Sequence, residues 1–479
     1  MHPISHNCIS SHVRLLALLL ISFLLLALIG CADGSGDETA LSTDLDENGL
    51  PTDLSFQGET VRILAFGTES GILRGDSEPL SVSRALYERA TRLKERFGIS
   101  LSVTVPPSSL SAEDERAFLA DLRNNVNSDS GRYDFFLSPL WISASAATNG
   151  LTSDLLSLPY FETDGDALSS LSLIGDRLFF YTDAFDPTFV RSLSCVVANE
   201  GLLEHSDELL SLCANGEFTL ECLFRFAEEA CAGDATMGLA VSESDVLPLL
   251  LGRNVTSMDS AQGALRMNER LGSALEELYQ IFLKETGGQT LSCPEIGFVS
   301  MKAGTLGFVI ADIGSAFALR NAADPDVELM VLPLPKRDAT QPTYRTAIGG
   351  DARGWAVLPG LSEERYALCG ALLSYLAGSE QQRIATEFAE SFYDTASPSE
   401  QDKEALFLTV VDSACFDFGI ATDEYFAFAF QNAIRTSIEK GYGPVAVEAS
   451  MQSLSKAMKP ILEEINARLR EQILAGTSG

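Results

Sequence analysis

Histidine is scarce in this chain of 479 residues, which contains only four, at positions 2, 6, 12 and 205. Zinc sites with two or three imidazole ligands and Ser-His-Asp triads both need a histidine beside other reactive groups. His205 lies in the polar stretch GLLEHSDELL, which is typical of a surface helix and contains no nucleophile motif. Motifs of the G-x-S-x-G, H-E-x-x-H and P-loop types are also absent. No metal site or cofactor is therefore expected.

Positive charge is in short supply as well. Lysine and arginine total 33 against 67 aspartates and glutamates, which gives a formal net charge of −34. No basic patch stands out, so the composition argues against nucleic-acid binding. Such acidity favours a soluble monomer and opposes broad contact with an anionic membrane surface.

Cysteine is present nine times, but no C-x-x-C motif occurs. Seven of the nine follow position 31, and an odd number outside the cell indicates at least one free thiol. Most of these seven stand among apolar residues and are expected to be small buried side chains. A disulfide such as Cys222–Cys231 stays open as an alternative.

The first 31 residues have the layout of a secretory signal. Arg14 precedes an apolar run of 16 residues, LLALLLISFLLLALIG, and no acidic residue occurs before Asp33. The run is shorter than the roughly 20 residues that span a bilayer, although a transmembrane anchor is the alternative. Its end, LIGC, resembles the lipobox of bacterial lipoproteins, in which the cysteine is acylated. We expect residues 1–30 to be a removed signal peptide and Cys31 to be the lipidated membrane anchor.

Residues 31–58 are rich in Gly, Ser, Thr, Asp and Glu, and residues 32–58 contain no Lys or Arg. Such a composition has little to bury, so it predicts a disordered acidic tether. The tether would hold the folded body away from the membrane.

The folded part opens with alternating strand and helix patterns. Apolar runs at 61–66 and 133–137 and the alternating segment 99–105 predict strands, and helical apolar spacing predicts a helix between each pair. Such β-α-β-α-β units form a mainly parallel sheet, so the fold class is α/β. Ligands of open sheets bind beyond the carboxyl ends of the strands, here residues 67–70 and 138–141.

Several later stretches carry a family resemblance: GDRLFFYTDAFDP (175–187), NGEFTLECLFRFAEEA (215–230), MKAGTLGFVIADIGSAFALRN (301–321), VELMVLPLPK, GWAVLP and VVDSACFDFG (410–419). In their order and spacing they resemble the extracellular solute-binding lipoproteins of bacterial ABC importers. These form family 1, the maltose-binding-protein-like class, and the last stretch is common in its clostridial-type members. The likeness covers about residues 60–470. Phe218 and Leu220 stand where the family's W-T-W-D helix start has tryptophans.

The resemblance implies a two-lobed, periplasmic-binding-protein-like type II fold with a hinge. It assigns residues 59–182 plus 302–350 to lobe 1, and 183–301 plus 351–479 to lobe 2. A carbohydrate would bind between the lobes on the extracytoplasmic face of the cell membrane and pass intact to the permease subunits of an ABC transporter. One alternative is a lipid-anchored glycoside hydrolase that uses two carboxylates. Another is the ligand-binding partner of a membrane sensor.

The candidate ligand contacts lie at strand ends and at the expected lobe crossings, where a cleft would form. Aromatic rings stack on the apolar faces of sugars, and carboxylates accept hydrogen bonds from their hydroxyls. Helix capping, hinge contacts and lobe packing are the alternative roles. The candidates are Glu69, Ser70, Trp141, Asp183, Asp186, Asp312, Arg353 and Trp355, followed by Arg191 and Tyr344.

Overall fold

The computed structural model describes residues 44–479 apart from 68–78, 107–110, 129–130, 163–172, 233–234, 262–263, 287–293, 325, 394–397, 422–428, 431, 437–443 and 477–479. From Leu45 onward the chain forms one compact unit. The expected signal peptide and its Cys31 lie outside the described residues. Among the described helices, none combines the length and the apolar character needed to cross a membrane.

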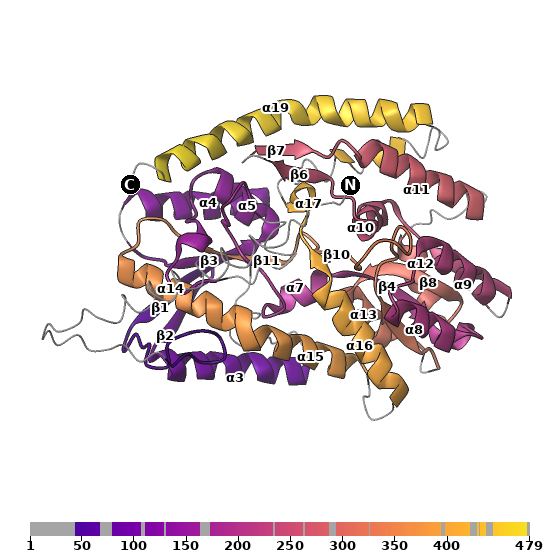
Figure 1. Ribbon diagram of the computed structural model, residues 1–479, viewed down its shortest axis with the longest axis horizontal. Helices are drawn as coiled ribbons and strands as arrows, with labels where there is room; N and C mark the ends of the chain where they lie inside the picture. Colours follow the sequence, from indigo (N-terminus) through magenta and orange to yellow (C-terminus); the bar gives the residue numbers. More distant parts are fainter. Residues whose placement is uncertain are drawn as a thin grey trace, which may run out of the picture. The chain divides into compact units, whose positions relative to one another are not determined.

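The first sheet has the strand order β11-β3-β1-β2. Its parallel strands are β1 (Thr60–Ala65), β2 (Ser100–Thr104) and β3 (Phe135–Pro139), and β11 (Arg353–Val357) runs antiparallel to β3. Two helices, α3 (Leu80–Phe97) and α4 (Ala112–Asn127), connect the parallel strands (Figure 1). The predicted β-α-β-α-β unit is confirmed.

Local chemistry sets the limits of these two helices. Helix α4 begins at Ser111, whose side chain accepts from the Asp114 backbone while Asp114 reaches back, forming a capping box. Helix α3 ends at Gly98, which adopts a left-handed conformation with φ 68°. Glycine takes that conformation without the steric penalty of a side chain.

The second sheet has the order β5-β8-β4-β9. Strands β5 (Met237–Ala240) and β8 (Leu306–Asp312) are parallel, and β4 (Ser194–Asn199) runs antiparallel to both β8 and β9 (Leu329–Leu332). Helices α9 (Leu220–Ala232), α12 (Pro294–Lys302) and α13 (Ile313–Ala322) contact β8. Strand β8 is buried along most of its length, as expected for a strand covered on both faces.

Strand pairing differs from the expected lobe assignment at three strands. Residues 302–350 were expected to belong with 59–182, yet their strands β8 and β9 pair with β4. Residues from 351 were expected to belong with 183–301, yet β11 pairs with β3. A continuous apolar run fits either sheet equally well, so the run alone could not choose the partner.

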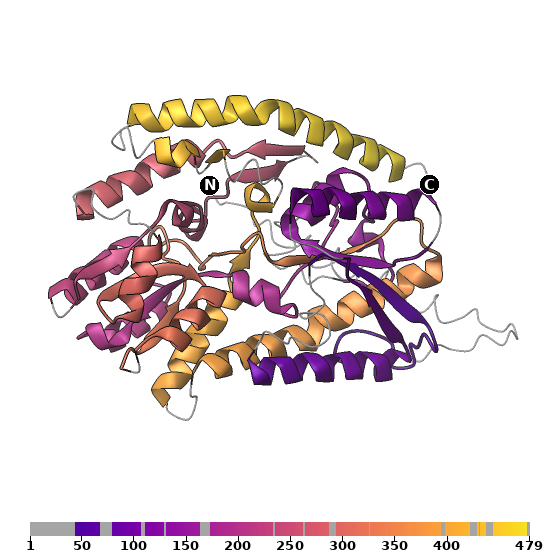
Figure 2. The same ribbon diagram turned by 180° about the vertical axis from the view of Figure 1, so that it is seen from behind.

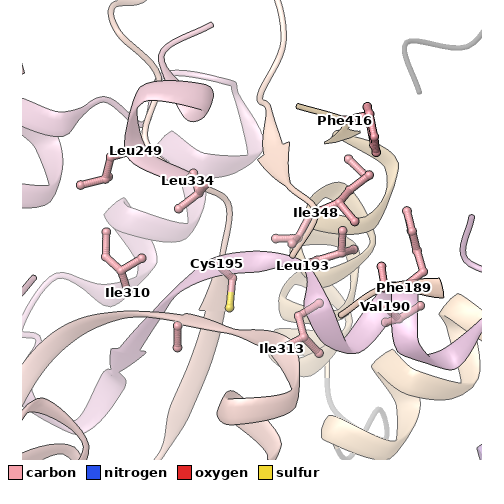
Figure 3. Close-up of a cluster of buried hydrophobic side chains, with 14 of the residues drawn as sticks. Phe189, Val190, Leu193, Cys195, Leu249, Ile310, Ile313, Leu334, Ile348 and Phe416 are labelled. Atoms are coloured by element: carbon pink, nitrogen blue, oxygen red, sulfur yellow. The ribbon is translucent and has the colours of Figure 1, made fainter. Parts of the chain in front are cut away.

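The chain passes between the two sheets in adjacent segments. Helix α7 (Pro187–Ser192) leads into β4, and β10 (Thr346–Ala347), which pairs with β12 (Ala414–Cys415), precedes β11. An isolated bridge joins Leu193 to Ile348. Figure 3 shows the buried apolar side chains gathered at this crossing, with Phe189, Val190 and Leu193 on one side of Ile348 and Phe416 near it.

The long helices α15 and α19, from the second half of the chain, lie along opposite sides of the fold (Figures 1 and 2). Helix α15 (Gln381–Phe392) contacts α3 and also α16 (Pro398–Asp412), which lies against β9. Helix α19 (Pro444–Gly476) contacts α11 (Leu271–Thr286), β7 (Ala264–Met267) and α5 (Leu140–Thr148). It has 33 residues and contains Pro460 in its interior. The remaining described α-helices and strands are α8 (Ser206–Ala214), α10 (Val246–Gly252), α14 (Glu363–Tyr375), α17 (Phe418–Ala421) and β6 (Met258–Ala261).

The end of the expected tether is packed rather than free. Leu50 is only 1% exposed, Arg96 of α3 forms an ion pair with Asp46 at 3.0 Å, and the Phe56 ring contacts Phe97. From residue 45 to 58 the chain therefore covers the C-terminal end of α3. The few apolar residues here were too widely spaced to reveal this packing from the sequence.

The described cysteines, six in number, are all free thiols. Cys195, Cys213, Cys369 and Cys415 are buried, as expected, and burial raises the pKa of each thiol. The disulfide considered for Cys222–Cys231 is not formed.

Candidate functional site

A pocket of about 690 Å³ lies at the carboxyl edge of the parallel pair β5 and β8. Five parts of the chain meet there: the crossing at 188–194, residues 240–248 from the end of β5, residues 297–298 of α12, residues 309–318 from the end of β8 into α13, and the approach to β11 at 349–351. This is the place where open α/β sheets bind their ligands. The polar lining residues are Thr188, Arg191, Ser192, Ser194, Ser242, Ser244, Asp245, Asp312, Ser315 and Asp351.

Asp312 connects the end of β8 to the start of α13. Its carboxylate accepts from the Ser315 backbone N at 2.7 Å and from the Ser315 hydroxyl at 3.0 Å, so it caps the helix. A Cβ at Gly314 would lie 3.1 Å from Asp312 Oδ1 and 3.3 Å from Arg191 Nε. The missing side chain therefore leaves room for this carboxylate and the guanidinium to approach in the pocket wall. Asp312 is both a helix cap and a pocket residue.

Asp245 is a pocket residue that the sequence reasoning missed. It ends the short 3-10 turn Glu243–Asp245, where the Ser242 backbone N and hydroxyl donate to Asp245 Oδ2 at 2.6 and 2.7 Å. Burial raises the pKa of its carboxyl from 3.8 to about 6, and the hydrogen bonds from Ser242 and Ser244 oppose that rise. The carboxyl therefore titrates around pH 6.

This shift predicts a pH dependence of stability. A raised carboxyl pKa favours the protonated folded state, so its stabilising contribution is complete below pH 3.8 and is lost as the pH rises through about 6. We expect the Asp245→Asn variant to lose less unfolding free energy than the parent between those two pH values. Urea titrations at a series of pH values would measure this, and parallel curves for the two proteins would contradict it.

Aromatic rings are sparse around the pocket. Phe298 is its one aromatic lining residue among those described. Trp355 is only 3% exposed, and its ring packs edge-on against Phe135 and Phe185. Trp141 is half-buried on α5 against the core and does not line this pocket. The structure thus places both tryptophans in packed positions.

Asp186 lies behind the pocket. It is 2% exposed and caps α7 by accepting from the Thr188 backbone N at 2.9 Å and from its hydroxyl at 2.7 Å. The Trp355 ring N–H donates to its other oxygen at 3.3 Å. Arg353, 8% exposed, donates its backbone N–H to the Thr188 hydroxyl at 3.0 Å. Thr188 itself lines the pocket, so this group of residues supports the pocket wall from behind.

The other candidates are dispersed. Asp183 accepts hydrogen bonds from the Tyr181 hydroxyl at 2.6 Å and the Ala184 backbone N at 2.7 Å. Tyr344 is buried, and its hydroxyl donates to the Cys213 carbonyl. Glu69 and Ser70 lie outside the described residues. Of the candidates within the described residues, Asp312 and Arg191 alone line the pocket itself.

The architecture is the two-lobed type II fold of periplasmic solute-binding proteins, as expected from the resemblance. A cyclo/maltodextrin-binding protein complexed with maltotetraose shares it with a TM-score of 0.53 at 13% identity, over 84% of this chain and 98% of that one. A family 1 extracellular solute-binding protein from Alicyclobacillus acidocaldarius matches with a TM-score of 0.53 at 11% identity, over 84% and 99% of the two chains.

The GacH receptor of Streptomyces glaucescens, solved unliganded and with acarbose, matches with a TM-score of 0.50 at 15% identity. That match covers 85% of this chain and 99% of the receptor. No protein-family model and no curated protein matches the sequence. At these identities the likeness establishes the fold.

Proposed function

We propose that this protein is an extracytoplasmic receptor that captures a carbohydrate in the 690 Å³ pocket. The observation that carries the proposal is the position of the pocket, where the crossing segments of the chain meet the strand ends of the second sheet. A solute bound there would contact both crossing segments. Its binding energy could thereby shift an equilibrium between open and closed forms.

The lining chemistry suits a polyhydroxylated solute. Asp312 and Asp351 offer carboxylate oxygens to hydroxyl groups, Arg191 offers N–H donors, and the serines can do either. Phe298 supplies one ring for an apolar sugar face. The neighbouring structures with maltotetraose and acarbose support the same ligand class.

We further propose that the receptor is a monomer anchored to the outer face of the cell membrane through acylated Cys31, after removal of residues 1–30. The solute would pass unchanged to the permease subunits of an ABC transporter. Each lobe would be organised around one of the two sheets, with a hinge near α7 and β10. The packing of residues 45–58 on α3 would shorten the tether to about residues 31–44.

A substitution that fills the pocket tests its role. Ala318 is exposed on α13 and lines the pocket, whereas Ala322 is exposed on the same helix and does not. We expect Ala318→Leu to weaken carbohydrate binding at least about tenfold, because the added side chain occupies solute space. Ala322→Leu should leave binding unchanged.

The measurement is a thermal-shift screen of the full-length protein in detergent with maltose, maltotetraose and other oligosaccharides, followed by calorimetry on any sugar that stabilises it. Equal binding by Ala318→Leu and the parent would rule out this pocket. Hydrolysis of the sugar during the titration would instead support the glycoside hydrolase.

A further inference from the structure

A second pocket, of about 470 Å³, lies beside the first turns of α11. It shares no lining residue with the carbohydrate pocket. Three arginines line it from separate parts of the chain: Arg253 follows α10, Arg270 precedes α11, and Arg337 follows β9. In a chain with a net charge of −34, such a local concentration of guanidinium groups requires an explanation.

Arg253 is the least accessible of the three, with 3% of its surface exposed. Its Nη2 donates to Glu277 Oε2 at 3.2 Å. Its Nη1 is buried and has no hydrogen-bond partner in the described part of the chain. A buried guanidinium nitrogen carries N–H donors that lose their water on folding, so leaving them unpaired is unfavourable. Arg253 therefore holds an unpaired donor in the wall behind the pocket, while its charge adds to that of the lining residues.

The Glu277 carboxylate is shared between two of the three arginines. Its second oxygen, Oε1, accepts from Arg337 Nη2 at 3.1 Å, so one carboxylate is shared between two guanidiniums. Glu276 is the one other acidic lining residue among those described. Among the lining residues three positive charges thus face two negative ones, and Asp338, outside the lining, lies 3.9 Å from Arg337 and offsets part of that excess.

We propose that this pocket binds a multiply charged oxyanion of the phosphate kind. Arginine forks match the oxygen geometry of phosphate, and charge-assisted hydrogen bonds are the strongest of their type. A tetrahedral anion can accept from several guanidiniums at once, which suits donors that converge from three parts of the chain. The anion would accept hydrogen bonds from the guanidiniums that line the pocket and would offset their positive charge.

The first test compares two exposed arginines. Arg270 lines the pocket, whereas Arg266 lies nearby on β7 outside it. We expect calorimetry of the full-length protein to show saturable binding of inorganic phosphate at constant ionic strength. Arg270→Gln should weaken that binding about tenfold, and Arg266→Gln should not change it. An equal loss in both variants would indicate nonspecific attraction and overturn the proposal.

The second test uses a variant with the opposite expected sign. Glu277→Gln removes the carboxylate that competes with the anion for Arg253 and Arg337, so phosphate should bind several-fold more tightly. A purely structural role for Glu277 would lower stability without this gain in affinity. Unchanged or weaker binding in Glu277→Gln, or the absence of saturable binding in the parent at millimolar phosphate, would show that the pocket contains only water.

Discussion

Replacing Asp186 by alanine is expected to lower the free energy of unfolding by about 3–5 kcal/mol, because it removes one member of a buried charge cluster. Arg89 of α3 is 2% exposed and donates to the Phe185 carbonyl beside Asp186. Burial lowers the pKa of Arg89, and the carboxylates of Asp186 and Glu380 oppose that effect. Without Asp186, the buried Arg89 guanidinium would lose much of the electrostatic attraction that offsets the cost of its burial.

The same substitution removes the cap of α7 and the acceptor for the Trp355 ring N–H. Urea unfolding followed by tryptophan fluorescence would measure the loss. Asp402→Ala is the matched control, since Asp402 is exposed on α16, and it should change stability by less than about 0.5 kcal/mol. A loss below about 1 kcal/mol for Asp186→Ala would mean that the cluster contributes little beyond an ordinary helix cap.

The Gly370→Ala variant, which adds one methyl group, is expected to lower the free energy of unfolding by about 3 kcal/mol. This value is at the upper end of the range for substitutions that overpack a core. A Cβ there would lie 1.9 Å from the Pro159 carbonyl oxygen and 3.2 Å from Leu158 Cβ. The obstacle is backbone, which cannot rotate away as a side chain could. The better helix propensity of alanine would offset only about 1 kcal/mol of this effect.

Gly272→Ala provides the comparison for this variant. Gly272 also lies in a helix, but its Cβ would meet only the flexible Met451 side chain, at 3.4 Å. We expect that variant to be neutral or slightly stabilised. Thermal unfolding of both proteins by calorimetry would measure the difference, and similar melting temperatures would show that the 158–160 segment moves aside easily.

The first sheet could be predicted from the sequence because its signals are local. Residues 80–97 carry helical apolar spacing and end at Gly98, and Ser111 and Asp114 begin the next helix. The sheets to which β8 and β11 belong could not be predicted in the same way. Strand β11 pairs with β3, which lies more than 200 residues earlier in the chain. The apolar pattern of neither strand specifies its pairing partner.

Two of the candidate residues, Asp312 and Arg191, line the pocket. Asp312 stood out because it follows a strand and precedes a helix, and it does both in the structure. Asp245 was overlooked, although S-x-x-D at 242–245 before an apolar run has the form of a helix start. This sequence pattern marks a helix cap. It does not reveal a pocket, because residues 188–194, which also line the pocket, are distant from it in the sequence.

The long helix α19 limits how the pocket could open. Its first half lies against α11, where Met451 approaches Gly272. Its second half is bound to other elements: Asn466 donates to the Leu265 carbonyl of β7 at 2.8 Å, and Arg468 donates to Asn149 at the end of α5 at 2.9 Å. Large displacements around the crossing segments must therefore slide or bend this helix. Pro460 lies between the two halves and lacks a backbone donor, so bending would concentrate there.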